Sequence, residues 1–298
     1  MHCCGIYELA NLTVKVLIAN LQVFPMVSPI KNQFQLEDLS PDLFPAPSKF
    51  VAEPPFVGGY GNDTIIGDEN NNVIKGNAGD DFILGVEGTD VIYGGKGNDT
   101  IAFDIAGMLS DSFSRGVYAN LSKQEAIDPC YNREKIYSIE NVIGTYKADE
   151  LIGDFRPNEL AGSDGNDKLL GKGGNDFLYG GRGPDFMIGG SGSDQYAYLD
   201  KSEGSDRIEG FKSGVDQIMI RGSWFLPGHP SSYSLGQLPS GQFFLGSAAE
   251  IDRQLFGFNP ATNQVLYDSN GAGPGGVFVI ATLTGSRGGI VASDIEIF

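Results

Sequence analysis

A nine-residue pattern of hydrophobic and polar positions fills two stretches of the chain, residues 58–102 and 144–197. Each unit begins with glycine, carries Asp or Asn at its sixth position and places a hydrophobic residue at its eighth. Because side chains alternate across a β-strand, the eighth position faces one side and the seventh and ninth face the other. The pattern therefore predicts short strands around a continuous apolar interior built from Ile65, Ile74, Ile83, Ile92, Ile101, Leu151, Leu160, Leu169, Leu178, Met187 and Tyr196.

The remaining positions of the unit favour turns joined to strands. Positions seven to nine are rich in Val, Ile, Phe, Tyr and Thr, which suit strands. Glycines at positions one, two and four permit tight turns whose backbone carbonyls are free to face inward. The chain has 43 glycines in 298 residues, about twice ordinary usage. This composition excludes a helical bundle.

The net charge of the chain limits the classes of partner that we expect. Twenty basic against 38 acidic residues give a formal net charge of −18. Nucleic acid and anionic membrane surfaces both need a basic patch, so neither is the expected main partner. The acidic residues recur in the register of the repeat, and carboxylate and carbonyl oxygens together are the ligands that Ca²⁺ prefers.

The unit resembles the hemolysin-type (RTX) calcium-binding nonapeptide repeat, G-G-x-G-x-D-x-U-x, and the units at Gly58, Gly94, Gly180 and Gly189 fit it almost letter for letter. The resemblance implies an all-β fold, a parallel β-roll in two arrays, with two units per 18-residue coil and calcium held in the loops between coils. Stacked sixth positions then give about seven Ca²⁺ sites. The implied metal ligands are Asp63, Asn72, Asp81, Asp90, Asp99, Asp149, Asp167, Asp176, Asp185 and Asp194, with the glycines Gly59, Gly61, Gly79, Gly97, Gly165, Gly183 and Gly192.

Particular units depart from the pattern. Asn72 and Asn158 replace Asp, which lowers the charge of their sites and predicts weaker binding. Arg156 and Pro157 stand where the loop favours glycine and a small residue, and Lys147 occupies a fourth position. The first coil of the second array is therefore expected to contribute shape more than metal.

Stacked carboxylates should make the roll depend on a cation. Strands of neighbouring coils lie about 4.8 Å apart. Two carboxylates at that spacing repel by roughly 3.5 kcal/mol at an effective dielectric constant near 20. Several such contacts would remove the whole stability of a typical domain, about 5–15 kcal/mol. We therefore expect a largely unfolded repeat region in chelator and a cooperative fold in millimolar calcium.

The repeats divide the chain into five segments. Residues 1–57 form an N-terminal segment without clear periodicity, 58–102 the first array, 103–143 a β-rich insert, 144–197 the second array, and 198–298 a β-rich cap. In the insert, GVYANL and KIYSIENVIGT favour strands, and a structural spacer hairpin is the main interpretation. In the cap, residues 264–284 predict two strands around a glycine-rich turn, where Asp268 and Asn270 favour a turn over a further calcium site.

The final residues, ASDIEIF, resemble the uncleaved C-terminal signal of RTX proteins exported by type I secretion. Asp294 stands as the acidic residue before a hydrophobic run that Glu296 interrupts, and a terminal edge strand is a compatible alternative. The resemblance implies a secreted, extracellular protein that meets the type I apparatus, with a cell-surface glycan or envelope as a further candidate partner. No stretch of the sequence is long and apolar enough to predict a transmembrane segment.

Candidate catalytic groups are few. The two histidines, His2 and His229, are too far apart for a His-Glu-x-x-His zinc site, and Ser232 does not lie in a G-x-S-x-G motif. Three cysteines, Cys3, Cys4 and Cys130, do not form a disulfide framework. We therefore expect a non-catalytic calcium-binding protein with a structural or surface-interaction role. The alternative is a non-catalytic module or fragment of an RTX exoenzyme of the protease, lipase or alginate epimerase type. A toxin that inserts into membranes is disfavoured, because the sequence has no hydrophobic pore-forming segment.

Overall fold

The computed structural model describes residues 49–51, 54–85, 88–103, 115–222, 236–250, 255–270, 273, 275–286 and 289–298. The chain forms two compact units, Met1–Leu151 and Ile152–Phe298. The boundary between them falls within the predicted second array, in the short strand β11 (Glu150–Ile152). The predicted five-segment division therefore differs from this two-unit division.

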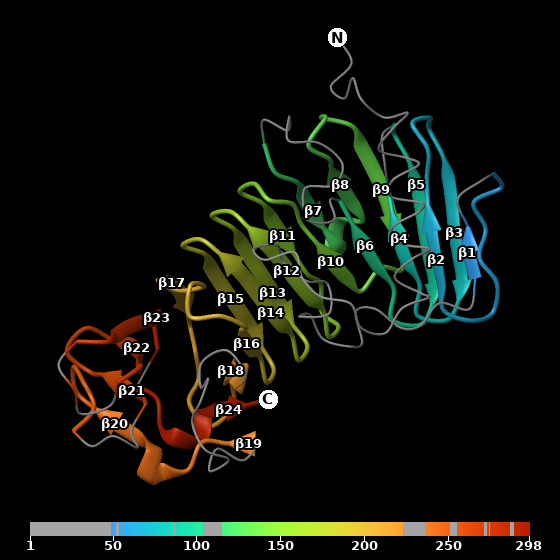
Figure 1. The fold of residues 1–298 in the computed structure, drawn as a ribbon. Coiled ribbons are helices and arrows are strands. Elements are labelled where there is room, and N and C mark those ends of the chain that lie inside the picture. Colours follow the sequence, from blue (N-terminus) through green and yellow to red (C-terminus); the bar gives the residue numbers. More distant parts are fainter. Residues whose placement is uncertain are drawn as a thin grey trace, which may run out of the picture. The chain divides into compact units, whose positions relative to one another are not determined.

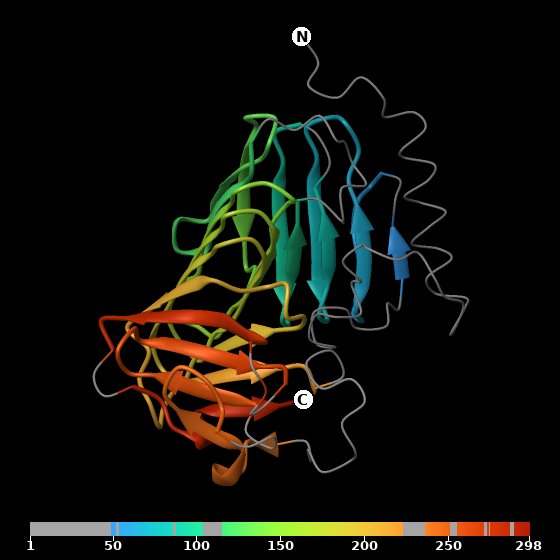
Figure 2. The same cartoon turned by 60° about the vertical axis from the view of Figure 1, so that its left-hand side comes forward.

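The first unit contains two sheets of short strands, drawn in blue to green in Figures 1 and 2. One sheet has the strand order β1, β2, β4, β6 and β10, and the other has the order β7, β8, β9, β5 and β3. Successive repeat units alternate between the sheets, as a coil of two units requires. The bounds are β1 (Lys49–Val51), β2 (Asp63–Ile66), β3 (Val73–Ala78), β4 (Phe82–Leu84), β5 (Val91–Lys96), β6 (Thr100–Ala102), β7 (Tyr118–Asn120), β8 (Glu125–Ile127), β9 (Arg133–Tyr137) and β10 (Asn141–Ile143).

Strand pairing follows the 18-residue coil. Ile65 of β2 pairs in parallel with Ile83 of β4, and Ile83 pairs with Ile101 of β6. The same register places Ile74 of β3 beside Ile92 of β5. All eleven eighth-position side chains are at most 1% exposed, which confirms the predicted apolar interior. The all-β, parallel β-roll architecture is confirmed.

The insert continues both sheets of the first unit. Strand β9 pairs in parallel with β5, and β10 pairs in parallel with β6. Strands β7 and β8 form an antiparallel hairpin, joined by the 3₁₀ helix η3 (Leu121–Lys123), and β8 pairs with β9. The two strand-like stretches predicted in the insert are confirmed. The insert is nevertheless more than a spacer hairpin, since β9 and β10 extend the roll by one further coil.

The second unit also contains two sheets. One has the order β12, β14, β16, β18, β24 and β19, and the other has β20, β21, β22, β23, β17, β15 and β13. Leu160 pairs with Leu178, and Leu169 pairs with Met187, again 18 residues apart and in parallel. The bounds are β12 (Glu159–Asp164), β13 (Lys168–Gly173), β14 (Phe177–Arg182), β15 (Phe186–Ser191), β16 (Gln195–Tyr198), β17 (Asp206–Glu209), β18 (Gln217–Ile220), β19 (Gly236–Gln237), β20 (Phe243–Leu245), β21 (Phe256–Asn259), β22 (Gln264–Asp268), β23 (Val277–Thr284) and β24 (Ile295–Ile297).

The strands of the cap continue both sheets of the second array. Strand β17 pairs in parallel with β23, and β23, β22 and β21 form antiparallel pairs, which confirms the two strands predicted in residues 264–284. Asp268 is fully buried and accepts the backbone N–H groups of Ala249 and Asn270, as a turn requires. Short 3₁₀ helices η4 (Ser240–Gln242) and η5 (Ala292–Asp294) precede β20 and β24.

The C-terminal strand is not an edge strand. β24 pairs in parallel with β18 on one side and antiparallel with the two-residue β19 on the other. Asp294 is buried, and its carboxylate accepts hydrogen bonds from Ser213 Oγ at 2.6 Å and from Gly214 N at 2.8 Å. The edge-strand alternative is therefore wrong, because the cap supplies a partner on each side.

Several predictions from the sequence concern residues outside the described ranges, among them His2, Cys3, Cys4, His229 and Ser232. Cys130 lies within them and forms no disulfide with a described residue. No helix in the described part of the chain combines the length and apolarity that crossing a bilayer requires.

Candidate metal centre

The candidate metal centre is distributed along the roll. Among the described residues, no three His, Cys, Asp or Glu side chains meet as one cluster. A cation held here must therefore take most of its ligands from backbone carbonyls, with few carboxylates for each ion. This is the ligand set that the glycine-rich turns predict.

The sixth-position side chains form what we call the aspartate ladder. In each case the backbone N–H of one residue donates to a carboxylate oxygen, Oδ1, of the residue 18 positions later. The distances from N to Oδ1 are 2.8 Å for Asp63 to Asp81, 2.8 Å for Asn72 to Asp90, 2.9 Å for Asp81 to Asp99, 2.9 Å for Asn158 to Asp176, 2.8 Å for Asp167 to Asp185 and 3.1 Å for Asp176 to Asp194. One oxygen of each accepting carboxylate thus holds the preceding coil in register.

The ladder continues beyond the sequence repeats. In the first unit, Asp90 N donates to Glu134 Oε2 at 2.6 Å and Asp99 N donates to Glu140 Oε2 at 3.0 Å. In the second unit, the last two repeat residues donate to Asp206 and Asp216 at 2.9 and 3.1 Å. The sequence analysis missed these four carboxylates because none lies 18 residues after its partner. The signal that could have found them is an acidic residue two positions before each apolar residue that extends the interior.

The second carboxylate oxygen of the ladder residues, Oδ2, is not hydrogen-bonded in the way that Oδ1 is. It is buried and has no hydrogen-bond partner within the described structure at Asp81, Asp99, Asp176, Asp185 and Asp194. All five residues are at most 2% exposed. An unsatisfied buried carboxylate oxygen is costly unless a positive charge or a donor meets it. These atoms are therefore where the geometry suits a hard cation.

The first coil of each array lacks this feature. There the backbone N–H at the second position of the unit donates to the sixth-position side chain: Gly59 to Asp63 Oδ2, Asp68 to Asn72 Oδ1 at 2.9 Å, Thr145 to Asp149 Oδ2 at 2.6 Å and Asp154 to Asn158 Oδ1 at 2.8 Å. In later units the second residue has a positive φ, as at Ser163 (85°) and Gly181 (94°). First-coil side chains are thus already satisfied by the backbone.

Arginine replaces glycine in the weakest predicted unit. The guanidinium of Arg156 lies 2.9 Å from Asp154 Oδ2, and the same carboxylate accepts the backbone N–H of Arg156 at 2.7 Å. A side-chain cation therefore already faces a carboxylate of this loop. The expectation that the coil contributes shape more than metal stays a prediction, and this ion pair supports it.

The glycines place carbonyl oxygens beside these carboxylates. A Cβ added to Gly76 would collide with Asp81 Oδ2 and with the carbonyl oxygen of Gly94. A Cβ on Gly171 would likewise meet Asp176 Oδ2 and, at 2.7 Å, the carbonyl oxygen of Gly189. The absent side chain leaves a small cradle lined by one carboxylate oxygen and one carbonyl oxygen. The donor set and the unsatisfied oxygens both fit Ca²⁺.

The fourth-position glycines stack in the same way. A Cβ on Gly183 would overlap the carbonyl oxygen of Gly165, and Gly183 has φ 124°. Gly61, Gly79 and Gly97 form the corresponding row in the first unit, and Gly192 stacks above Gly174 in the second. Six of the seven glycines predicted as ligands therefore occupy fourth positions of the repeat turns. The seventh, Gly59, occupies a second position and donates its backbone N–H to Asp63.

A second ladder, which the sequence analysis also missed, runs in the opposite direction. The fifth-position side chain accepts the backbone N–H of the fifth residue one coil later. Asp80 N donates to Asn62 Oδ1 at 2.7 Å, and Asn98 N donates to Asp80 Oδ1 at 2.8 Å. Asn71 and Asn175 accept equivalent bonds. Each turn is thus tied both to the coil before it and to the coil after it.

Burial shifts the acidity of the ladder carboxyls. It is the largest cause that raises the pKa of Asp185 to about 8, those of Asp90, Asp99 and Asp176 to about 7, and that of Asp81 to about 6, against 3.8 for an ordinary Asp. The backbone hydrogen bonds lower these values, and repulsion by neighbouring carboxylates raises them further. Burial likewise raises the pKa of Glu134 to about 8. At pH 7 the metal-free carboxyls of Asp185 and Glu134 are therefore mostly protonated, whereas that of Asp81 is mostly ionised.

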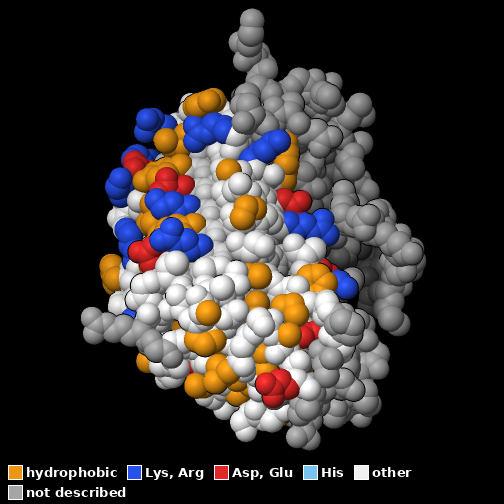
Figure 3. All heavy atoms as spheres, turned by 90° about the vertical axis from the view of Figure 1, so that its left-hand side faces the viewer, with side chains coloured by type: hydrophobic (Ala, Val, Ile, Leu, Met, Phe, Trp, Pro, Cys, Tyr) orange, Lys and Arg blue, Asp and Glu red, His pale blue; other side chains and the backbone are white. Residues whose placement is uncertain are grey.

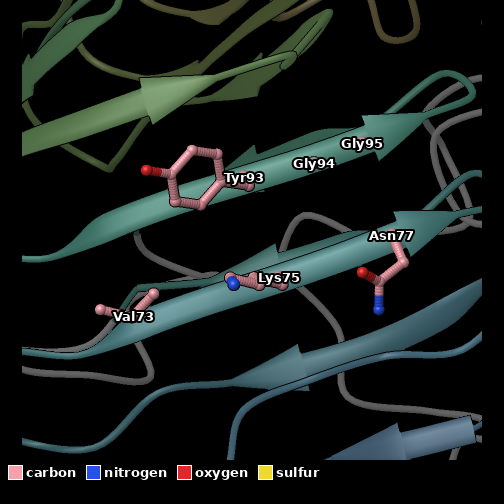
Figure 4. Close-up of a pocket in the computed structure, with 6 residues that line it drawn as sticks. All are labelled: Val73, Lys75, Asn77, Tyr93, Gly94 and Gly95. Carbon is pink, nitrogen blue, oxygen red and sulfur yellow. The ribbon is translucent and has the colours of Figure 1, made fainter.

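The outer surface of the roll differs chemically from its turns. Figure 3 shows Lys and Arg side chains gathered on part of one face, with scattered acidic side chains among them. A shallow groove of about 390 Å³ lies on the sheet between β3 and β5, lined by Val73, Lys75, Asn77, Tyr93, Gly94 and Gly95 (Figure 4). Those lining residues include no carboxylate, imidazole or thiol.

Comparison with known proteins identifies the repeat. A family model described as the RTX calcium-binding nonapeptide repeat matches four copies, at residues 57–92, 84–102, 143–178 and 161–196. The repeats belong to the RTX calcium-binding family. These RTX matches cover both arrays and leave the insert and the cap unmatched. A comparison with curated proteins found no match.

The chain is also similar in part to two solved structures. The AlgE6R3 subunit of the Azotobacter vinelandii mannuronan C5-epimerase shares 24% identity with a TM-score of 0.34, covering 50% of this chain and 77% of that subunit. The extracellular lipase LipA from Serratia marcescens shares 16% identity with a TM-score of 0.28, covering 80% of this chain. The match spans 39% of the lipase chain, about two fifths of its length.

Proposed function

We propose that the chain is an extracellular calcium-binding RTX protein whose roll folds on binding several Ca²⁺ ions and serves a structural or surface-interaction role. One observation carries the proposal. The ladder carboxylates use one oxygen to cap the preceding coil, and at five of them the other oxygen is buried without a hydrogen-bond partner among the described residues. Such a carboxylate is satisfied either by a proton or by a cation.

The residues of the chain would divide the work of holding the ion. Asp81, Asp99, Asp176, Asp185 and Asp194 supply buried charge, and the carbonyls of the glycine turns supply neutral oxygens. Bound calcium would neutralise carboxylates that otherwise repel one another within a few ångströms. The two ladders fix the spacing of the coils, so the ligands of one turn are held in place by its neighbours.

Calcium titration tests this proposal. Far-UV circular dichroism should report a largely unfolded repeat region in chelator and a cooperative gain of β-structure in millimolar calcium. Isothermal titration calorimetry should give several ions per chain, with about seven expected from the stacked positions. Identical spectra in chelator and in calcium, together with no heat of binding, would overturn the proposal.

We also propose export by a type I apparatus, which would take the loose chain from low cytoplasmic calcium to millimolar calcium outside. Deleting residues 293–298 would remove β24 and disturb the cap as well as any signal. A sharper comparison is Asp294→Asn against Ser213→Ala, because both affect the same buried hydrogen bond but only the first alters the C-terminus. Reduced export of D294N alone supports a signal, whereas full export of both variants and of the deletion contradicts it.

A role as a non-catalytic module of an RTX exoenzyme makes the same calcium prediction. Both roles exclude catalysis by the chain itself, so we expect the purified chain to show no protease, lipase or epimerase activity in calcium. Turnover by the purified chain would contradict both.

A further inference from the structure

The turn between β9 and β10 has the hydrogen bonds of a repeat turn but not its sequence. Asp99 N donates to Glu140 Oε2 at 3.0 Å, and the backbone N–H groups of Glu140 and Asn141 both donate to the Asp99 carbonyl oxygen at 3.0 Å. Within the array, Asp81 N donates to Asp99 Oδ1 at 2.9 Å and Thr100 N donates to the Asp81 carbonyl at 2.8 Å. Glu140 thus stands where the next sixth-position Asp would stand.

The strand register supports this equivalence. Thr100 pairs with Asn141, and Ile101 pairs with Val142. Asp99 and Glu140 immediately precede the first of these pairs, so they lie at the same level of the two strands. Val142 is fully buried and continues the apolar interior. Because Glu140 lies 41 residues after Asp99 instead of 18, no nonapeptide pattern includes it. The matched repeats end at residue 102 and resume at residue 143.

A backbone carbonyl continues the neutral half of the site. A Cβ on Gly94 would collide with the carbonyl oxygen of Ser138 and lie 2.5 Å from Asp99 Oδ2. One coil earlier, a Cβ on Gly76 would meet the carbonyl of Gly94 and Asp81 Oδ2. Ser138 therefore takes the place of the first-position glycine of the missing unit. Its φ of 51° gives the turn the left-handed backbone that such a short connection needs.

The carboxylate of Asp99 points to a ligand. Asp99 is fully buried, and its Oδ2 has no hydrogen-bond partner within the described structure, as at Asp81 and Asp176 in the arrays. Glu140 is 8% exposed, so its carboxylate is also largely removed from water. Two buried carboxylates beside an inward carbonyl are a hard-oxygen donor set, suited to Ca²⁺ more than to the smaller Mg²⁺, which demands a stricter octahedron.

We infer that Glu140, together with Asp99 and the Ser138 carbonyl, forms a further calcium site at the end of the first array, so that the insert closes the metal ladder of the first unit. The inference rests on the proposed function, since it needs the neighbouring RTX turns to bind calcium. It assigns a metal-binding role to Glu140 and Ser138, which lie outside every matched repeat.

Calorimetry on the full chain tests the site. Glu140→Gln keeps an amide oxygen that accepts the Asp99 N–H but removes the charge, so the roll should still fold and should bind one Ca²⁺ fewer per chain. Glu125→Gln is the matched control, because Glu125 lies in β8 of the same insert, is partly exposed and pairs with Lys123 outside the ladder. The control should bind the same number of ions as the original chain.

A second measurement covers the case in which Glu140→Gln fails to fold. Crystals of the unaltered chain soaked in Tb³⁺, a calcium substitute with strong anomalous scattering, should show a peak between Asp99 and Glu140 as well as in the repeat turns. Peaks in the repeat turns without one at Asp99 and Glu140, or unchanged stoichiometry in a folded E140Q variant, would overturn the inference alone. Absence of calcium binding by the original chain would instead refute the proposed function.

Discussion

The backbone N–H of Asp81 donates a 2.9 Å hydrogen bond to Oδ1 of Asp99, while Oδ2 of the same Asp99 is buried without a hydrogen-bond partner among the described residues. The two oxygens of one side chain therefore have separate tasks. One fixes the distance between coils, and we propose that the other binds a cation. This separation lets a substitution that exchanges a single oxygen test metal binding without removing the ladder.

Asp81→Asn should weaken calcium binding while leaving the roll intact. The amide oxygen can still accept the Asp63 N–H, but the charge beside the Gly94 carbonyl is lost. We expect calcium to bind on the order of tenfold more weakly at one site, because ligand charge sets the affinity of calcium sites. The folded fraction in chelator should rise, since burial raises the pKa of Asp81 to about 6 and the amide carries no charge to bury. Calorimetry and circular dichroism measure the two effects.

Asp80→Asn is the matched control for that experiment. Asp80 is the adjacent residue and loses the same charge, but it belongs to the fifth-position ladder, where Asn62 already performs the same hydrogen bond. Its calcium affinity should stay within about twofold of the original. Equal weakening by both substitutions would mean that overall charge, and not the sixth-position oxygen, governs binding.

The metal-free fold should become less stable as pH rises. The folded pKa values of about 7 for Asp99 and about 8 for Asp185 exceed the ordinary 3.8, so between about pH 4 and 8 the folded state binds more protons than the unfolded chain. The stability that protonation provides is fully present below about pH 4 and is lost as pH rises through 7 to 8. In calcium-free buffer, the folded fraction measured by circular dichroism should therefore be higher at pH 5 than at pH 8.

General repulsion in a chain of net charge −18 would give the same sign, so salt provides the control. At 1 M ionic strength the Debye length is about 3 Å, which screens surface charges but not buried pairs. The difference between pH 5 and pH 8 should survive in 1 M salt. Apparent calcium affinity should increase over the same pH range, because the cation must displace protons. A calcium-free folded fraction that does not fall as pH rises would contradict the burial of these carboxyls.

Periodicity predicted the interior of the two arrays, because the eighth position of every unit obeys one geometric rule. Ile65 and Tyr196, at opposite ends of the repeats, are 0 and 1% exposed. The sixth-position residues were found for the same reason. Glu134 and Glu140 were not predicted, because they lie six positions apart and the repeat has a period of nine. Only the pairing of β9 with β5 and of β10 with β6 places them in line with the ladder.

The physical basis of the expected metal dependence also needed the structure. From spacing alone, repulsion between stacked carboxylates is the dominant destabilising effect. In the folded chain burial is the largest cause of the raised pKa of Asp99, and repulsion by Asp81 follows it. The depth of burial depends on how closely neighbouring coils cover each turn, which a nonapeptide pattern does not contain.

Gly183→Ala should destabilise the calcium-loaded roll far more than Gly210→Ala. Both glycines have positive φ, 124° and 79°, so alanine is strained at either position by about 1–2 kcal/mol. A Cβ on Gly183 would also overlap the Gly165 carbonyl, whereas nothing lies within 4 Å of a Cβ on Gly210. We expect the free energy of unfolding in urea to fall by roughly 1–3 kcal/mol more for G183A. Equal losses would show that the coils are not closely stacked at this turn.

The hydroxyl of Tyr179 ties the second array to the segment that follows it. It donates to Glu203 Oε1 at 2.7 Å, and the other oxygen of Glu203 accepts the backbone N–H groups of Leu199 and Asp200 at 2.7 and 3.1 Å. Glu203 is 6% exposed, and burial is the largest cause that raises its pKa to about 7. Tyr179→Phe removes one donor from a buried carboxylate and should lower the free energy of unfolding by about 1–3 kcal/mol.

The loss from Tyr179→Phe should grow above pH 7, where Glu203 is charged and most needs its donors. Tyr93→Phe provides the comparison, because Tyr93 is 40% exposed on β5 and its ring stacks on Tyr137 with centroids 5.0 Å apart, a contact that phenylalanine retains. This variant should stay within about 0.5 kcal/mol of the original chain at every pH. If urea unfolding at pH 6 and pH 8 gives the same loss for Y179F and Y93F, the Tyr179–Glu203 hydrogen bond does not stabilise the end of the second array.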